Sequence, residues 1–142
     1  MRTVRQLLDG KAKGVHTVDA DDLVRTAIKK MADHLVGALP VLRSGRLVGI
    51  VSERDYARKI LLMGRNSAET KVATIMSAPV IQVGPQNSVN DCMMLMTDKR
   101  IRHLPVVEND MLIGVISIGD CVKAVIDEQR QEIEDLRRYI AG

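Results

Sequence analysis

The chain has 142 residues, enough for one compact domain or for two half-domains that share a core, and too few for two ordinary independent domains. Hydrophobic residues make up 46% and charged residues 27%, which is typical of a globular protein and excludes a disordered one. Lys and Arg outnumber Asp and Glu by only 21 to 18. With two Tyr and no Phe or Trp, the chain is a poor match for proteins that stack nucleic-acid bases on aromatic side chains.

Neither the cysteines nor the histidines suggest a metal site. Cys92 and Cys121 stand among apolar residues, where a thiol usually fills core space, and no Cys/His cluster has the spacing of metal ligands. The start, MRTVRQLLDGKAKG, lacks the apolar core of a signal peptide, and no apolar run is long enough to span a membrane. We therefore expect a cytoplasmic protein without metal or membrane contact.

The predicted elements begin with a short helix around VRQLLDG, in residues 1–14. An extended piece, VHTV, leads into a helix over residues 19–34 with apolar residues at helical spacing. Two strands, ALPVL and LVGIVS, follow and are joined by the turn RSGR, whose Gly45 suits a tight hairpin. Asp55 then opens a second helix, DYARKILLM. Three acids suit the positive start of the helix over residues 19–34: Asp19, Asp21 and Asp22.

The same order of elements returns 65 residues later. Residues 15–60 lie over residues 80–125 without a gap, and GIVSERD at 49–55 meets GVISIGD at 114–120. The unit in each copy reads strand, helix, strand, strand, helix. The expected organisation is a first repeat over 15–65, a linker with a short helix over 66–79, a second repeat over 80–128 and a helical tail over 129–142.

The repeated strand exit, where the last strand of each copy leads into the following helix, carries chemistry that suits a nucleotide. Gly49 leaves room beside the strand for a ligand or for a closely packed neighbour. Ser52 offers a hydroxyl at the strand end, and Asp55 places a carboxylate on the first helical turn, where it can accept two hydrogen bonds from a vicinal diol such as ribose. The other interpretation is that serine and acid only cap an ordinary helix. The second copy repeats the pattern with Gly114, Ser117 and Asp120.

The element order, the gapless duplication and the repeated Gly…Ser-x-x-Asp pattern resemble the cystathionine-β-synthase (CBS) domain family, and the pair looks like the tandem assembly called a Bateman module. The resemblance covers about residues 1–128. It implies an α/β fold of the α+β type, in which two pseudo-symmetric β-α-β-β-α repeats pack sheet to sheet. It also implies that the segment before the first strand covers the companion repeat.

The same resemblance assigns ligand positions. In this family the acid of the Ser/Thr-x-x-Asp pattern typically holds the ribose hydroxyls of an adenine nucleotide, while groups near the first strand and before the Leu-Pro-Val strand hold adenine. Basic residues before that strand typically reach the phosphate in the other repeat's site, as Arg102 and His103 would here. Carried onto this chain, the adenine positions are Thr17, Val18, Gly37 and Ala38 in the first site, and Gln82, Val83, Arg102 and His103 in the second.

The two predicted sites differ in charge. Arg54 and Arg58, beside Asp55, would favour a phosphate or diphosphate, or else form a solvated basic helix face. The second site has Lys123 as its obvious cation. We expect the first site to take AMP, ADP, ATP or NAD(H). The second would bind AMP more weakly or stay empty, with S-adenosylmethionine the less favoured ligand.

The tail carries an apolar stripe of Ile126, Ile133, Leu136 and Ile140, which packs either on its own body or on the same helix of a second subunit. No nucleophile with an adjacent base and no phosphate-binding loop is recognisable, so we do not expect an enzyme. The prediction is a homodimeric adenine-nucleotide sensor, in which a ligand in the clefts between the two repeats modulates an unknown protein partner or the dimer state. A structural interaction module with empty clefts is the alternative, and a nucleic-acid adaptor is third.

Overall fold

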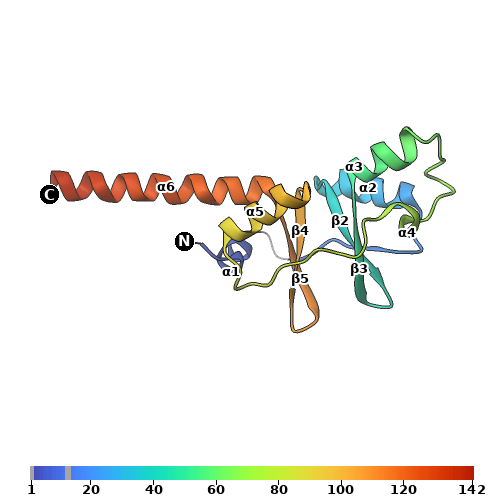
Figure 1. The fold of residues 1–142 in the computed structure, drawn as a ribbon, viewed down its shortest axis with the longest axis horizontal. Helices are drawn as coiled ribbons and strands as arrows, with labels where there is room; N and C mark the ends of the chain where they lie inside the picture. The colour runs from blue at the N-terminus through green and yellow to red at the C-terminus, as the bar shows by residue number, and fades with distance from the viewer. Residues whose placement is uncertain (1, 12–13) are drawn as a thin grey trace. The chain divides into compact units, whose positions relative to one another are not determined.

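The computed structural model describes residues 2–11 and 14–142 (Figure 1). The chain divides into two compact units, one formed by Met1–Gly14 with Gln82–Gly142 and the other by Val15–Ile81. Each unit holds one small sheet with its helices, and no described helix combines the length and apolar character needed to cross a membrane. The mixed helix and strand content confirms the predicted α+β fold class.

The unit Val15–Ile81 is built on a three-stranded sheet in the order β1-β2-β3. β1 runs parallel to β2, and β3 runs antiparallel to it. The hairpin turn between β2 and β3 uses Ser44 and Gly45, which both have positive φ, the backbone of a tight two-residue turn. The elements are β1 (Val18–Asp19), α2 (Val24–His34), β2 (Ala38–Arg43), β3 (Arg46–Ser52), α3 (Glu53–Tyr56), the π-helical η1 (Ala57–Leu61) and α4 (Val72–Ile75).

The core of this unit lies between α2 and the sheet. Val24, Ala27 and Met31 recur on one face of α2 and are buried, and they join Leu39 and Val51 of the strands in one apolar cluster. The predicted role of the acids before α2 is wrong, because the helix begins at Val24 without a side-chain cap. The acids instead form a turn, in which the carboxylates of Asp22 and Asp19 accept from the backbone N–H groups of Asp19 and Asp21, respectively.

Among its described residues, the other unit pairs two strands, β4 and β5, in an antiparallel hairpin. In the second repeat, the extended piece that corresponds to VHTV is VIQV at residues 80–83, and it is reduced to a single bridge between Val83 and Val106. Asn109 and Asp110 form the hairpin turn with positive φ, as Ser44 and Gly45 do in the first. The elements are α1 (Val4–Asp9), α5 (Val89–Lys99), β4 (His103–Glu108), β5 (Met111–Ser117) and the long α6 (Ile118–Ala141).

The N-terminal segment belongs to the unit of the second repeat. Val4 N–H donates to the Asn87 carbonyl at 2.9 Å, and Val89 N–H donates to the Arg2 carbonyl at 3.0 Å. Val4 and Leu7 of α1 are buried. This confirms the expectation that the segment before the first strand covers the companion repeat.

Candidate ligand-binding sites

The first candidate site lies at one edge of the β1-β2-β3 sheet. Because β3 is antiparallel to β2, the end of β3 lies beside the start of β2, while Val18 at the start of β1 pairs with Val41, three residues further along β2. Ala38 at the start of β2 lies opposite Ser52 at the end of β3. The Gly37 carbonyl accepts from the first N–H of α3, that of Glu53, at 3.0 Å. The sheet thus brings four predicted residues of the first repeat to one edge, Gly37, Ala38, Ser52 and Asp55, whereas Val18, with Thr17 just before it, is in register with the middle of β2.

Asp55 is held by a capping box at the N-terminus of α3. Its backbone N–H donates to Ser52 Oγ at 3.2 Å, and its Oδ2 accepts from Ser52 N–H at 3.0 Å and from Ser52 Oγ at 3.1 Å. The side chain is buried, with the residue only 9% exposed. Ser52 and Asp55 therefore cap the start of α3.

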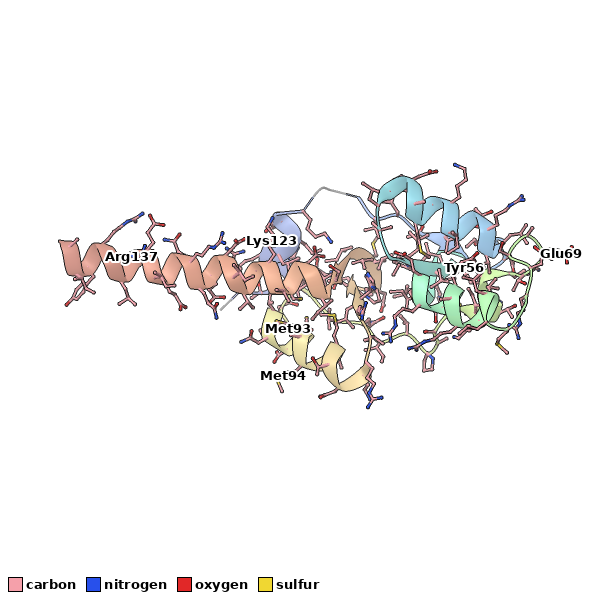
Figure 2. All side chains as sticks on the ribbon, turned by 90° about the horizontal axis from the view of Figure 1, so that it is seen from above. Tyr56, Glu69, Met93, Met94, Lys123 and Arg137 are labelled. Atoms are coloured by element: carbon pink, nitrogen blue, oxygen red, sulfur yellow. The ribbon has the colours of Figure 1, made fainter. Side chains whose placement is uncertain are left out.

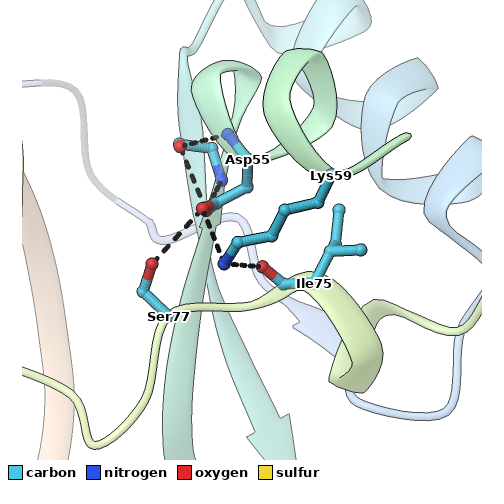
Figure 3. Close-up of polar contacts among 5 residues, drawn as sticks. Asp55, Lys59, Ile75 and Ser77 are labelled. Carbon is cyan, nitrogen blue, oxygen red and sulfur yellow. Dashed lines mark hydrogen bonds and ion pairs between the residues drawn. The ribbon is translucent and has the colours of Figure 1, made fainter. Parts of the chain in front are cut away.

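The other oxygen of Asp55 is also engaged (Figure 3). Oδ1 accepts from Ser77 Oγ at 3.3 Å and lies 3.4 Å from Lys59 Nζ, which itself donates to the Ile75 carbonyl at 2.9 Å. A carboxylate has about four acceptor positions, and here four contacts surround it. A ribose diol would have to compete with Ser77 and Lys59 for this oxygen.

The predicted phosphate ligands of the first site, Arg54 and Arg58, lie on either side of Asp55 in a helix that differs from the predicted one. The predicted continuous helix is instead α3 followed by η1, in which Leu62 N–H donates to the Ala57 carbonyl five residues back. Single π turns of this kind occur often at functional sites. Arg54 is half-buried on α3, and Arg58 is exposed on η1.

The second candidate site repeats the same edge in the other unit. His103 at the start of β4 lies opposite Ser117 at the end of β5, and the Arg102 carbonyl accepts from Ile118 N–H at 2.9 Å. Val83 lies beside β4 through its bridge to Val106, while Gln82 is exposed. The parallel between Gly37–Glu53 and Arg102–Ile118 shows that both repeats build the helix start in the same way.

Asp120 is less enclosed than Asp55. It forms the same capping box with Ser117, whose N–H donates to Oδ2 at 2.9 Å, and Lys11 Nζ donates to that oxygen at 2.7 Å. Lys11 also donates to the Val115 carbonyl at 2.9 Å. Burial by itself would raise the pKa of Asp120, but the bonds from Lys11 and Ser117 outweigh it and leave the pKa below the ordinary value. Within the described part of the chain, Oδ1 of Asp120 accepts no hydrogen bond.

Three polar side chains around the two acids were not among the predicted site residues: Lys59, Ser77 and Lys11. Lys59 stands four residues after Asp55, a spacing that places it on the same helix face and was visible in the sequence. Ser77 and Lys11 come from segments 22 and 109 residues away from the acids they contact, so no local sequence pattern predicts these contacts. Lys123, the expected cation of the second site, is exposed on α6.

The repeated glycines, Gly49 and Gly114, make room for neighbouring side chains and backbone of the same chain. A Cβ on Gly49 would lie 2.7 Å from Met76 Sδ and 2.9 Å from the Ser77 carbonyl oxygen. A Cβ on Gly114 would lie 2.6 Å from a methyl group of Leu8. Of the two roles expected for these glycines, the structure supports the closely packed neighbour in both units.

The comparisons with known proteins agree with this architecture. The profile of the CBS domain family matches residues 5–62 and 72–127. The mitochondrial CBS domain-containing protein CBSX3 of Arabidopsis thaliana is 49% identical over 86% of this chain, which spans 62% of that relative's length.

Solved structures give the same result. A CBS-domain protein of Burkholderia ambifaria MC40-6 is 49% identical and superposes with a TM-score of 0.87 over 90% of this chain and 96% of that one. The CBS domain pair of protein MJ0100, solved with 5′-methylthioadenosine and S-adenosyl-L-methionine, is 23% identical with a TM-score of 0.80 over 90% of this chain and 98% of that one. The two matched repeats and the strand exits that they share show that this chain belongs to the CBS domain family, as a tandem pair.

Proposed function

We propose that this protein is a non-enzymatic regulatory module that binds an adenine nucleotide through Asp55 and Asp120. The observation that carries the proposal is the duplicated edge, in which an acid fixed by a capping box stands beside the starts of the neighbouring strands. A fixed carboxylate next to backbone groups suits a ribose diol and an attached base. The ligands of MJ0100, which shares the fold with this chain, both contain an adenosine group.

The two sites are proposed to differ in what binding requires. At Asp120, Oδ1 can accept a ribose hydroxyl without loss of the contacts from Lys11 and Ser117 on Oδ2. At Asp55, a ligand has to compete with Ser77 and Lys59 for Oδ1. The nearby Arg54 and Arg58 would favour ligands with phosphates, AMP, ADP, ATP or NAD(H), at the first site. S-adenosylmethionine, which has no phosphate, fits the second site better than the first.

The remaining predictions from the sequence, on phosphate ligands, partner, oligomeric state and location, belong to this proposal. Arg102 and His103 would reach the phosphate of the first site, and Lys123 that of the second. We expect ligand binding to change the affinity for an unknown protein partner, which requires that the ligand prefers one of two conformations. We also expect a cytoplasmic homodimer that does not act on nucleic acids or membranes, although the relative CBSX3 is mitochondrial.

Calorimetric titration of AMP, ATP, NAD⁺, NADH and S-adenosylmethionine into the wild type, Asp55→Ala and Asp120→Ala tests the proposal. Ser52→Ala and Ser117→Ala are the matched controls, because they remove the cap hydroxyl and keep the carboxylate. The proposal predicts loss of binding at the mutated site in each Asp variant and only modest weakening in each Ser variant. No heat with any ligand, or equal effects of both kinds of variant, would contradict it.

A structural interaction module remains the second candidate function, favoured by one observation. The carboxylate of Asp55 is satisfied by Ser52, Ser77 and Lys59 without any ligand. On this account the aspartates only stabilise helix starts, and Asp55→Ala lowers the free energy of unfolding by about 1 kcal/mol without changing any binding.

A further inference from the structure

The long helix α6 has two faces with different roles. Cys121 and Ala124 are buried against the rest of their unit, near the start of the helix. From Gln129 to Ala141 every residue is exposed, and in Figures 1 and 2 this half of α6, marked by Arg137, extends beyond α1 and α5 of the same unit. Apolar side chains nevertheless continue along it: Ile133 is 51% exposed, Leu136 60% and Ile140 81%.

These apolar residues follow a seven-residue repeat. With Ile126 at position a, the other a positions are Ile133 and Ile140, and the d positions are Val122, Gln129 and Leu136. The buried Cys121 and Ala124 fall at positions c and f, on the other side of the helix. The contacts of α6 with its own unit therefore leave the a and d positions uncovered.

We propose that the occupant of this face is a second copy of the chain, in a parallel two-stranded coiled coil formed by residues 122–140 of α6. Isoleucine at all three a positions, with leucine at one d position, Leu136, matches in part the pattern of β-branched a and leucine d residues that favours parallel dimers. The seam formed by the a and d positions is short, so the two α6 helices are also stabilised by the folded units from which they project. The proposal does not depend on nucleotide binding.

The charges beside the seam favour the parallel orientation. In a parallel pair, position g of one helix faces position e of the next heptad in the partner, which places Glu132 beside Arg137 of the other copy, twice by symmetry. Among the described residues, neither side chain forms an ion pair within its own chain. In an antiparallel pair, e faces e, so that Lys123, Arg130 and Arg137 would meet only basic side chains.

Gln129 supports the same orientation. In a parallel pair the two Gln129 side chains meet and can hydrogen-bond to each other, whereas the antiparallel register places each opposite an isoleucine, Ile133. The polar contacts on the helix surface lie away from the seam. Gln131 bonds to Asp135 at 2.9 Å and Arg138 to Glu134 at 2.7 Å, all at positions b, c and f.

The oligomeric state of the full chain tests the proposal by sedimentation equilibrium. The wild type is expected to be a dimer, and Ile133→Asp should raise its dissociation constant by about 100-fold, because two unpaired carboxylates would enter the seam. Gln131→Asp, on the outer face, is the matched control and should leave the dimer intact. A monomeric wild type, or a dimer indifferent to Ile133→Asp, would overturn the proposal.

Charge reversal at Glu132 and Arg137 tests the interhelical ion pairs and leaves the apolar residues of the seam unchanged. Glu132→Arg and Arg137→Glu should each weaken the dimer by several-fold, and an equimolar mixture of the two variants should form heterodimers in which both pairs are restored. Leu136→Cys should cross-link to itself under mild oxidation, whereas the control Arg138→Cys should not. Mixing without heterodimers, or a dimer in which Leu136→Cys fails to cross-link, would contradict the parallel orientation.

Discussion

Lys11 Nζ lies 2.7 Å from Asp120 Oδ2, across 109 residues of sequence, and donates to the carboxylate that the second repeat carries at its strand exit. In the first repeat the corresponding carboxylate, Asp55, takes its lysine from its own helix, four residues on. The two repeats therefore neutralise the same acid in different ways. The lysine of the second site depends on the docking of the N-terminal segment.

Lys11→Met should raise the pKa of Asp120, since the bond from Lys11 helps to hold it below its ordinary value. A carboxyl group whose pKa is lower in the folded state stabilises the fold above its unfolded pKa of about 3.9 and loses that effect as the pH falls through the folded pKa. The variant should therefore lose less than about 1 kcal/mol at pH 7, because the pair is partly exposed. The loss should fade toward acid pH.

Carboxyl-detected NMR titration of Asp120, with urea unfolding at several pH values, measures both effects. Lys29→Met is the matched control, because Lys29 pairs with Asp33 on α2 and should leave the titration of Asp120 unchanged. A loss of stability that is the same at acid and neutral pH would show that Lys11 acts through packing and not through Asp120.

Gly49→Ala should destabilise the protein more than Gly114→Ala. At Gly49 the new methyl group meets the Ser77 carbonyl oxygen at 2.9 Å, and backbone cannot easily move away. At Gly114 it meets the end of the Leu8 side chain, which can turn aside. We expect a loss of about 1–3 kcal/mol at Gly49 and a smaller one at Gly114. Thermal unfolding of the two variants measures which one loses more stability, and equal losses would argue against this prediction.

Gly119→Ala is the control for both glycine variants. Gly119 lies in the first turn of α6, and its new Cβ would only contact Ser117 Oγ at 3.6 Å. Because alanine is favoured over glycine in a helix, this variant should be neutral or more stable by up to about 1 kcal/mol.

Cys92 and Cys121 should resist thiol reagents in the native state. Burial raises the pKa of each thiol to about 11, with smaller contributions from Asp91 at Cys92 and from Cys92 at Cys121. At pH 8 roughly one thiol in a thousand is then a thiolate, and both side chains are fully covered. Ellman's reagent should label neither cysteine in native protein and both in urea. Rapid native labelling would show that α5 and α6 separate readily.

Much of the fold could be predicted from the sequence because local and repeated patterns carry it. Gly45 in the first hairpin turn, and Asn109 and Asp110 in the second, tolerate positive φ, and the gapless duplication transfers each element from one copy to the other. The N-terminal segment was assigned to the second repeat only through the family resemblance. No local pattern distinguishes the two possible partners of α1.

What the sequence could not predict depends on long-range contacts and on helix geometry. The acids before α2 fit a helix start by charge, but their side chains bond within a turn that ends before Val24. The periodicity of DYARKILLM does not reveal the π turns of η1. At the site, Asp55 and Asp120 look equivalent in sequence, and only the folded chain shows that Ser77 and Lys11 make their surroundings different.

Ser77→Ala should strengthen nucleotide binding at the first site. Ser77 Oγ donates to Asp55 Oδ1 and competes with a ribose hydroxyl for that oxygen. A hydrogen bond of this kind contributes about 1 kcal/mol net, so its removal should tighten binding by roughly five-fold. Titration of Asp120→Ala, which isolates the first site, with and without Ser77→Ala measures the change. Weaker binding would show that Ser77 organises the site.

The most direct test of the central claim changes the ligand and leaves the protein intact. If the two aspartates hold a vicinal diol, AMP should bind to the wild-type chain, and 2′-deoxy-AMP should bind at least about ten-fold more weakly, because one hydroxyl partner of a fixed carboxylate is missing. Calorimetry of both nucleotides under the same conditions gives the ratio. Equal affinities, or no binding of AMP, would contradict the assignment of Asp55 and Asp120 as ribose ligands.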